Sequence, residues 1–394
     1  MNKQSKIKRV LQIAAVTLVI AICAAGLPAS ADDTKKTVAM SYTAKSVLLI
    51  EQQTGQVLFE QNPTEALAPA SLTKLMDLIL ICEALDQGVL TIDQTLTCSA
   101  YAKTMGGSEI WLKEGEQMTV DELLKALIVA SANDAAVVFA EAICASEQAF
   151  VEKMNQRAQE MGLVNTHFVN CTGFDEEGHY TCAQDVAAMA RELMEHHSDL
   201  IVPYSTIWMD SLRSGETELV NTNRLVRFYD GTTGLKTGTT DAAGHCLCAT
   251  ATRGDFDLIA VVMGCKTSDQ RFEEAKQLLD YGFGSFMRYQ PQPVDDQLLP
   301  VPVTRGVQTE VTPLLSQLPQ AIIRKDQAEL IEMKVQLASE VEAPISQGQE
   351  LGKVSLILEG ETLAEEPICA SNEVERLTFS KSFQRLLQGL IKMS

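Results

Sequence analysis

The chain has 394 residues, of which 46% are hydrophobic and 21% are charged, so it is globular and long enough for two domains. It carries 32 basic and 52 acidic residues, which gives a formal net charge of −20 at pH 7. An acidic excess of this size excludes nucleic acid as an expected partner, because the phosphate backbone would repel it.

The N-terminus has the pattern of a secretory signal peptide. Basic residues lie among the first nine positions, an apolar run follows over residues 10–25, and Ala29-Ser30-Ala31 resembles a cleavage site. We expect residues 1–31 to be removed before Asp32 and the mature protein to be exported. The rival interpretation, an uncleaved membrane anchor, is weaker because the apolar run is short for a bilayer span.

The ten cysteines do not predict a disulfide framework. Loss of Cys23 with the signal peptide leaves an odd number, and most of the others lie inside apolar runs, where cysteine behaves as a small hydrophobe. Cys171 and Cys182 are close enough in sequence to leave one bridge open. Neither Cys246-x-Cys248 nor the five histidines have zinc spacing, so we expect no metal and no cofactor.

The stretch from Pro69 to Met76 places a hydroxyl beside an amine. A helix that begins near Ser71 puts Ser71 and Lys74 on one face, because side chains three residues apart are neighbours. A serine hydroxyl needs a base within reach, and a lysine serves only if burial or nearby cations lower its pKa. The Ser-x-x-Lys pattern alone is weak evidence, since Ser5 and Lys8 also match it.

Two further motifs follow in order. Ser131-Ala132-Asn133 falls between a helix that opens with a capping box, Thr119 and Glu122, and a second helix over residues 134–145. Lys236-Thr237-Gly238 precedes an alternating β-rich stretch, which predicts an edge strand whose glycine lets a ligand backbone approach. The three motifs together are the signature set of penicillin-binding proteins and class A β-lactamases.

The other elements expected around these motifs are a hairpin, two helices and a second domain. Ser46–Ile50 and Gln56–Glu60 predict the hairpin, and Thr181 is the expected cap of a helix that ends near residue 196. A later helix should run from Ser268 to Asp280 and end at Gly282.

Four prolines between positions 291 and 302 predict a linker, and the short apolar segments that follow predict a small all-β domain over residues 298–375. Residues 377–394 place apolar side chains on one helical face and basic ones elsewhere, as in an amphipathic helix on a membrane surface. A helix packed on its own domain is the open alternative.

Arg271 is a candidate for anion binding. A cation three residues after the expected cap Ser268 opposes the helix dipole and destabilises the helix unless an anion binds there. The terminal carboxylate of a substrate would be such an anion, and a solvated surface arginine is the alternative.

Several segments resemble the low-molecular-mass penicillin-binding proteins that are serine D-Ala-D-Ala carboxypeptidases, with the sporulation-associated firmicute branch the nearest. These segments are Pro69–Lys74, Ser131–Ala135, Thr166–Phe168, Gly234–Thr240 and Leu278–Phe283. The resemblance implies an α/β, β-lactamase-like domain over residues 40–290, in which an antiparallel sheet is flanked by helices and joined to a helical subdomain. It extends more weakly into the C-terminal β domain and tail.

Carried over by motif, the resemblance implies that Ser71 is the acylated nucleophile and Lys74 the base that takes its proton. Ser131 would relay a proton to the leaving D-alanine, and Asn133 would hydrogen-bond the substrate peptide.

On the β side of the site, the resemblance implies that Lys236 is a cation that helps to keep Lys74 neutral. Thr237 and Thr239 would contact the carboxylate and backbone of the substrate beside Gly238, and Arg271 would hold the carboxylate. The N–H groups of Ser71 and Thr239 would form the oxyanion hole.

The function implied is removal of the terminal D-alanine from peptidoglycan pentapeptide stems through an acyl-enzyme that β-lactams also form. The enzyme would work outside the cytoplasmic membrane, with its tail on the membrane surface. A β-lactamase is less favoured, because Glu216 and Glu218 have the wrong spacing to Asn221 for a deacylating glutamate. A non-catalytic wall-binding protein is less favoured because all three motifs are intact.

Overall fold

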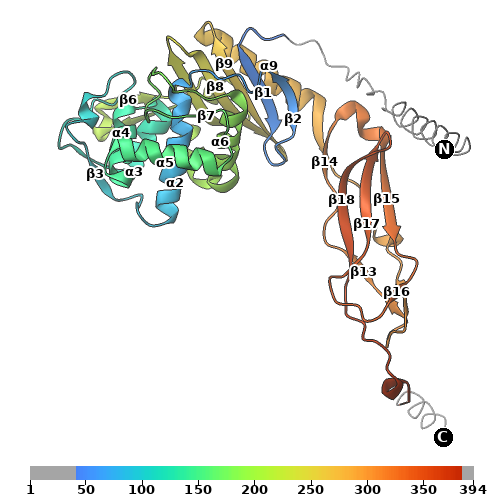
Figure 1. The fold of residues 1–394 in the computed structure, drawn as a ribbon. Coiled ribbons are helices and arrows are strands. Elements are labelled where there is room, and N and C mark those ends of the chain that lie inside the picture. The colour runs from blue at the N-terminus through green and yellow to red at the C-terminus, as the bar shows by residue number, and fades with distance from the viewer. Residues whose placement is uncertain (1–40, 384–394) are drawn as a thin grey trace, which may run out of the picture. The chain divides into compact units, whose positions relative to one another are not determined.

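The computed structural model describes residues 41–383 (Figure 1). The expected signal peptide and residues 384–394 of the expected tail helix lie outside the described residues. At the start of that tail, residues 379–383 are helical, and the rings of Phe379 and Phe383 are exposed and stacked. Within the described part of the chain, every helix is too short or too polar to cross a bilayer.

An antiparallel sheet of five strands carries the first part of the chain, in the order β2-β1-β9-β8-β7 (Figure 1). Its strands are β1 (Ser46–Glu51), β2 (Val57–Gln61), β7 (Thr232–Thr240), β8 (Gly244–Arg253) and β9 (Phe256–Cys265). The predicted hairpin and the predicted β-rich stretch are thus confirmed, and β7 lies at an edge as expected. The neighbouring strands pair antiparallel throughout.

Both faces of the sheet are buried. Leu48, Ile50 and Ile259 belong to the main hydrophobic core, together with helices on one side. Leu49 and Leu258 point the other way and contact Gly282 of α9 (Ser268–Ser285), because successive side chains of a strand alternate between faces. Because both faces of the sheet are buried, successive residues of its strands are nearly all apolar.

The chain between β2 and β7 forms the helical part of this domain. The helices are α2 (Lys74–Asp86), α3 (Val120–Lys125), α4 (Asn133–Cys144), α5 (Glu147–Glu160), α6 (Ala183–His196), α7 (Ser198–Ser205) and α8 (Leu225–Phe228). Two small hairpins, β3 (Thr95–Thr97) with β4 (Gln117–Thr119) and β5 (Met209–Leu212) with β6 (Thr217–Val220), complete this part.

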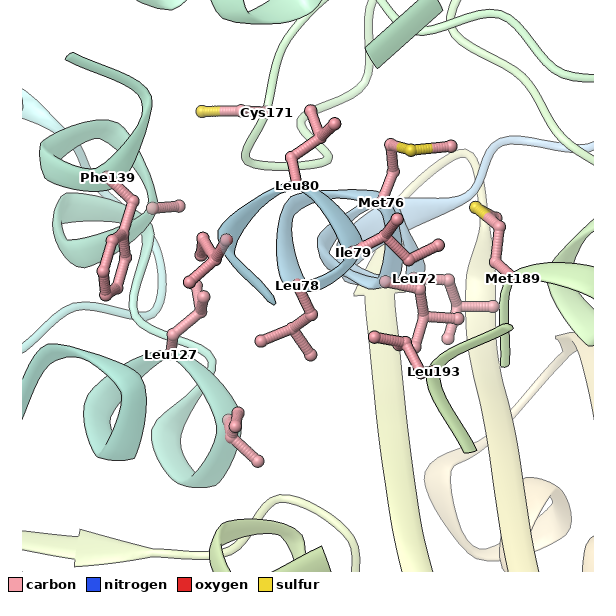
Figure 2. Packing of buried hydrophobic residues seen from close by; sticks show 14 of the residues in the cluster. Leu72, Met76, Leu78, Ile79, Leu80, Leu127, Phe139, Cys171, Met189 and Leu193 are labelled. Carbon is pink, nitrogen blue, oxygen red and sulfur yellow. The ribbon is translucent and has the colours of Figure 1, made fainter. Parts of the chain in front are cut away.

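Helix α2 is the centre of the core. Residues 74–82 are buried all round the helix, which is the pattern of a fully enclosed helix rather than a surface one. Figure 2 shows Leu78 and Leu80 leaving α2 on opposite sides, and Leu72 beside Met189 and Leu193 of α6. The first turn of α2 is therefore held on every side.

The helix ends follow the sequence with three corrections. The capping box of Thr119 and Glu122 is confirmed at the start of α3. Helix α6 is capped by Cys182, whose Sγ accepts a hydrogen bond from Asp185 N, and not by Thr181 as expected. Helix α9 is capped by Thr267 instead of Ser268. It does not end at Gly282, because that glycine leaves room for Leu258 and the helix continues to Ser285.

The C-terminal part is all-β. Its strands are β10 (Phe286–Tyr289), β11 (Val301–Thr304), β12 (Glu310–Val311), β13 (Pro313–Leu315), β14 (Ala321–Arg324), β15 (Ile331–Leu337), β16 (Val341–Glu342), β17 (Glu350–Leu358) and β18 (Glu361–Ala370). β10 pairs with β14, and β13-β18-β17-β15 form a sheet of their own. Pro302, which we expected in a linker, is part of β11.

All nine cysteines among the described residues are free, so no bridge joins Cys171 and Cys182. Seven of the nine are buried. These thiols are core residues, as their apolar sequence context predicted.

A buried ion pair joins β10 to β1. Arg288 Nη2 lies 2.7 Å from Glu51 Oε1, and the Glu51 side chain is fully buried. The other carboxylate oxygen accepts from the backbone N and Oγ1 of Thr54 at 2.7 and 2.6 Å. Without Arg288, the buried carboxylate of Glu51 would therefore lack a cation, and its Oε1 would lose this hydrogen bond.

We predict that Arg288→Ala lowers the free energy of unfolding by about 3 kcal/mol, because it leaves a buried carboxylate without its cation. The matched control is Arg305→Ala, which removes an exposed pair with Glu342 and should cost less than about 1 kcal/mol. Denaturant unfolding of the three proteins measures both values. Equal losses for the two variants would contradict the prediction.

Candidate active site

Ser71 lies in a tight turn that leads into α2. The turn is a short 3-10 helix over Ala70–Thr73, and Lys74 follows as the first residue of α2. The Lys74 Nζ atom lies 3.3 Å from Ser71 Oγ. The predicted proximity of the hydroxyl and the amine is thus present in the structure.

The hydrogen bonds of Lys74 suit a neutral amine. Its Nζ donates to Asn133 Oδ1 at 2.7 Å and to the carbonyl oxygen of Thr172 at 2.6 Å. A neutral amine has two N–H donors and one lone pair, so these two acceptors leave the lone pair for the hydroxyl of Ser71.

Burial lowers the pKa of Lys74 to about 8, against the attraction of Asp77, Cys171 and Asp134. Enclosure by the core is thus the main reason that Lys74 loses its proton easily. The expected help from the charge of Lys236 stays a prediction.

Ser131 lies where the helix containing α3 ends. It follows a π-helical turn over Ala126–Ala130 and has a left-handed backbone, with φ +63°. A non-glycine residue in this region is uncommon and is concentrated at functional sites. Its Oγ accepts a hydrogen bond from Lys236 Nζ at 2.8 Å, which joins the second motif to the third.

The Asn133 amide is engaged at both ends within the protein. Its Oδ1 accepts from Lys74, and its Nδ2 donates to the carbonyl oxygen of Gly106 at 2.7 Å. The backbone N of Asn133 also donates to Ser108 O. Asn133 therefore orients the amine of Lys74, and its expected contact with the substrate stays a prediction.

The third motif lies on the edge strand β7. Lys236 and Thr237 are buried, and Thr237 Oγ1 donates to Thr222 Oγ1 at 2.8 Å. Burial, and then the charges of Lys74 and Arg271, lower the pKa of Lys236 well below its ordinary value. Thr239 is exposed at the end of the same strand.

Gly238 leaves room for the turn that carries the nucleophile. A Cβ atom at this position would lie 2.9 Å from Ala70 Cβ, 3.0 Å from Pro69 O and 3.1 Å from Ser71 N. The backbone of the nucleophile turn thus approaches Gly238, and the expected approach of a ligand backbone stays a prediction. Gly173 approaches the same turn, where a Cβ would lie 2.0 Å from Ala70 O.

Arg271 lies beside the open end of β7. Its Nη1 donates to Gly238 O at 3.0 Å and to Thr239 Oγ1 at 2.9 Å. Burial lowers the pKa of this guanidinium to about 10, and no carboxylate forms an ion pair with it among residues 41–383. A buried cation without a counter-ion is suited to hold an anion.

The structure thus brings together all nine residues that the sequence predicted for the site: Ser71, Lys74, Ser131, Asn133, Lys236, Thr237, Gly238, Thr239 and Arg271. Glu216 and Glu218, considered for a β-lactamase, are exposed. Sequence reasoning missed the carbonyl of Thr172, for which no residue type is a signal. It also missed Gly173, whose approach to the nucleophile turn joins segments that are distant in sequence.

A serine activated by a buried lysine, between a five-stranded sheet and a helical region, defines an acyl-transfer enzyme of the penicillin-binding type. The chain belongs to the D-alanyl-D-alanine carboxypeptidase family, which it matches over residues 33–267. Residues 286–376 match the C-terminal domain of penicillin-binding protein 5.

Individual relatives agree with this family. The chain is 41% identical to D-alanyl-D-alanine carboxypeptidase DacF of Bacillus subtilis over 360 residues, covering 90% of this chain and 92% of that protein. Penicillin-binding protein 5 of Haemophilus influenzae is structurally similar, with a TM-score of 0.73, 29% identity and coverage of 86% of this chain and 99% of that one. Penicillin-binding protein D2 of Listeria monocytogenes, in its ampicillin-bound form, has a TM-score of 0.55, 29% identity and coverage of 62% and 98%.

We predict that Gly238→Ala slows acylation of Ser71 about a hundredfold, because the new methyl group displaces the nucleophile turn by a fraction of an ångström. Acylation by a fluorescent penicillin measures the rate. Gly284→Ala is the matched control, since a Cβ there meets nothing within 4 Å, and it should keep the wild-type rate. Equal rates for all three proteins would contradict the account of Gly238.

Proposed function

We propose that Ser71 attacks the carbonyl carbon of the penultimate D-alanine in a peptidoglycan stem and that Lys74 accepts its proton. The observation that carries this proposal is the Lys74 amine, which faces Ser71 Oγ at 3.3 Å while its N–H groups are held by Asn133 and Thr172. The attack forms an acyl-enzyme and breaks the bond to the terminal D-alanine.

The proton then has a short route to the leaving amine. Ser131 Oγ is 2.8 Å from Lys236 Nζ, so the hydroxyl can pass a proton to the leaving nitrogen and regain one from its neighbours. The N–H groups of Ser71 and Thr239 are the proposed oxyanion hole. Water then hydrolyses the acyl-enzyme, and Ser71 regains its proton.

The terminal carboxylate of the stem is proposed to bind at Arg271 and Thr239. Thr239 is exposed next to a buried guanidinium that lacks a counter-ion, so a carboxylate can reach the end of β7 and be held there. Thr237 and Gly238 lie on the same strand and would border the bound peptide. β-Lactams, which carry a carboxylate and a reactive carbonyl, are proposed inhibitors of the same site.

The remaining proposals concern location and domains. We infer that residues 1–31 direct export, that residues 40–290 form the catalytic domain, and that residues 298–375 form the β domain. Residues 377–394 are proposed to lie on the outer surface of the cytoplasmic membrane. The exposed rings of Phe379 and Phe383, on one face at the start of this segment, support membrane contact.

Mass spectrometry after benzylpenicillin treatment, followed by release of D-alanine from a diacyl-D-Ala-D-Ala peptide, tests the function. We predict a covalent adduct on the peptide that contains Ser71 and its loss in Ser71→Ala, with Ser146→Ala as a control that keeps it. Ser146 caps α5 and should affect only stability. An adduct elsewhere, or an adduct hydrolysed as fast as it forms with no D-alanine release, would overturn the carboxypeptidase assignment.

Arg271→Leu should lower kcat/KM for the carboxylate peptide about a hundredfold, because it removes one partner of a desolvated charge pair. The same peptide with a C-terminal amide should lose much less, since it offers no charge to Arg271. Arg253→Leu is the control, because this arginine is exposed and stacks on Tyr229. An equal loss on the two peptides would count against carboxylate binding at Arg271.

A further inference from the structure

Ala70, the residue before the nucleophile, has an unusual backbone conformation. Its φ is +49°, in the left-handed region that residues other than glycine seldom adopt, and the residue is completely buried. Such a conformation costs free energy and persists only where neighbouring groups fix it. Because Ala70 is bonded directly to Ser71, the groups that fix its backbone also set the direction of the serine.

A chain of three hydrogen bonds ends on the carbonyl oxygen of Ala70. Thr73 Oγ1 donates to that oxygen at 2.8 Å, and Nε2 of His179 lies 2.8 Å from the same hydroxyl. On the other side of the ring, the backbone N of Val169 donates to His179 Nδ1 at 2.9 Å. Thr73 is fully buried and His179 is 5% exposed, so the chain is shielded from solvent and its bonds strengthen one another.

The two ends of this chain fix the direction of every bond in it. A backbone N–H can only donate, so His179 Nδ1 is an acceptor and the proton of the neutral ring is on Nε2. A carbonyl oxygen can only accept, so the Thr73 hydroxyl gives its hydrogen to Ala70 O and accepts from the ring. Burial lowers the pKa of His179 to about 4, which agrees with a neutral ring. The chain therefore requires one tautomer in one protonation state.

His179 also lies at the junction of two segments that the reaction uses. The loop of residues 169–178 carries Thr172, whose carbonyl oxygen accepts from Lys74 Nζ at 2.6 Å. The same loop carries Gly173, which packs against the nucleophile turn. The ring follows this loop in sequence and bonds to both the loop and the turn. It therefore fixes the segment that orients the base relative to the segment that carries the serine.

We propose that His179 is a positioning residue for acylation, which acts through Thr73 to hold Ala70 in its left-handed conformation. This conformation directs the Ser71 hydroxyl toward the substrate carbonyl. The inference rests on the proposed function and leaves its chemistry unchanged, because the proton of the serine still passes to Lys74. The ring of His179 gains and loses no proton during the reaction.

The test separates the binding of a fluorescent penicillin to the full chain from the acylation step that follows, by varying the penicillin concentration. Thr73→Val removes the hydroxyl and keeps the branched shape. His179→Phe removes both ring nitrogens and keeps the aromatic contact with Phe168. We expect each variant to lower the first-order acylation rate constant about thirtyfold and to leave the initial binding unchanged, because a misdirected nucleophile reacts poorly in a site that is still open. Wild-type rate constants in both variants would overturn the inference.

The double variant shows whether the two residues act through one chain. Breaking the same chain twice should cost no more than breaking it once, so the double variant should be about as slow as the slower single variant. A loss of about a thousandfold, the product of two independent effects, would overturn the shared chain.

Thr73→Ser is the rescue variant, because it keeps the hydroxyl. It should stay within about threefold of the wild-type acylation rate constant, since the chain remains complete. A rate constant as low as that of Thr73→Val would show that the hydroxyl is not what matters and would overturn the inference. The two Thr73 variants decide the question even if His179→Phe does not fold.

Two matched controls separate positioning from general stability. Thr181 is as buried as Thr73, and its hydroxyl bonds to Thr166 Oγ1 at 2.8 Å. Thr181→Val should lower the thermal midpoint and keep the wild-type acylation rate constant. His167→Phe changes an exposed ring of the same region and should also keep it. If Thr181→Val is as slow as Thr73→Val, the effect is a general loosening and the positioning role fails.

Nitrogen NMR of the full chain with labelled histidines tests the tautomer directly, and His179→Phe identifies the signal. We expect a neutral ring near neutral pH, with the proton on Nε2 and none on Nδ1. A charged ring, or a proton on Nδ1, is incompatible with the chain and would overturn the inference.

The outcomes for the two proposals are separable. If the wild-type chain forms no adduct with penicillin, the proposed function fails. If the wild type is acylated and the variants at Thr73 and His179 are acylated at the same rate, only the role of His179 fails.

Discussion

Taking an amine out of water disfavours its charged form, and the fold does this to Lys74 by placing it in the first turn of a helix that is enclosed on every side. The apolar side chains of α2 pack against α4 and α6 (Figure 2), so the position of the amine is set by the whole core. Asn133 and the carbonyl of Thr172 then fix its direction. Stability of the domain and reactivity of the serine therefore depend on the same packing.

A second constraint holds the serine itself. The turn before α2 lies between two glycines, Gly173 on one loop and Gly238 on β7, each too close to the turn backbone to admit a side chain. Because Gly238 neighbours Lys236 and Thr239 on one strand, the strand that holds the turn also presents the Lys236 amine and the Thr239 hydroxyl. Positioning and electrostatics are thus supplied by one short segment.

Much of the site could be predicted because its parts are local in sequence. Ser71 and Lys74 are neighbours by helical spacing alone, and Ser131 was expected at a junction between helices, where the structure places it. What could not be predicted depends on contacts between distant segments. The backbone that Gly238 admits is an example, because nothing in its own motif says which chain approaches.

The misplaced helix ends have a related cause. Thr267 and Ser268 are adjacent hydroxyl residues and either can cap a helix, so backbone geometry decides between them. Cys182 is not an expected cap, because sulfur is a weak hydrogen-bond acceptor. Gly282 was predicted to end the helix, because glycine is common at that position. Inside the helix it instead leaves room for the side chain of Leu258, which packs against it.

The free cysteines lie in several separate regions of the fold, and each can react with a thiol reagent. Cys82 and Cys171 lie in the helical core, Cys248 in the central sheet and Cys369 in the C-terminal strands. Where such a sulfur is covered, an alkylating reagent reaches it only when its surroundings open. The order in which the native cysteines are modified therefore shows the order in which the separate regions open, and no label has to be introduced.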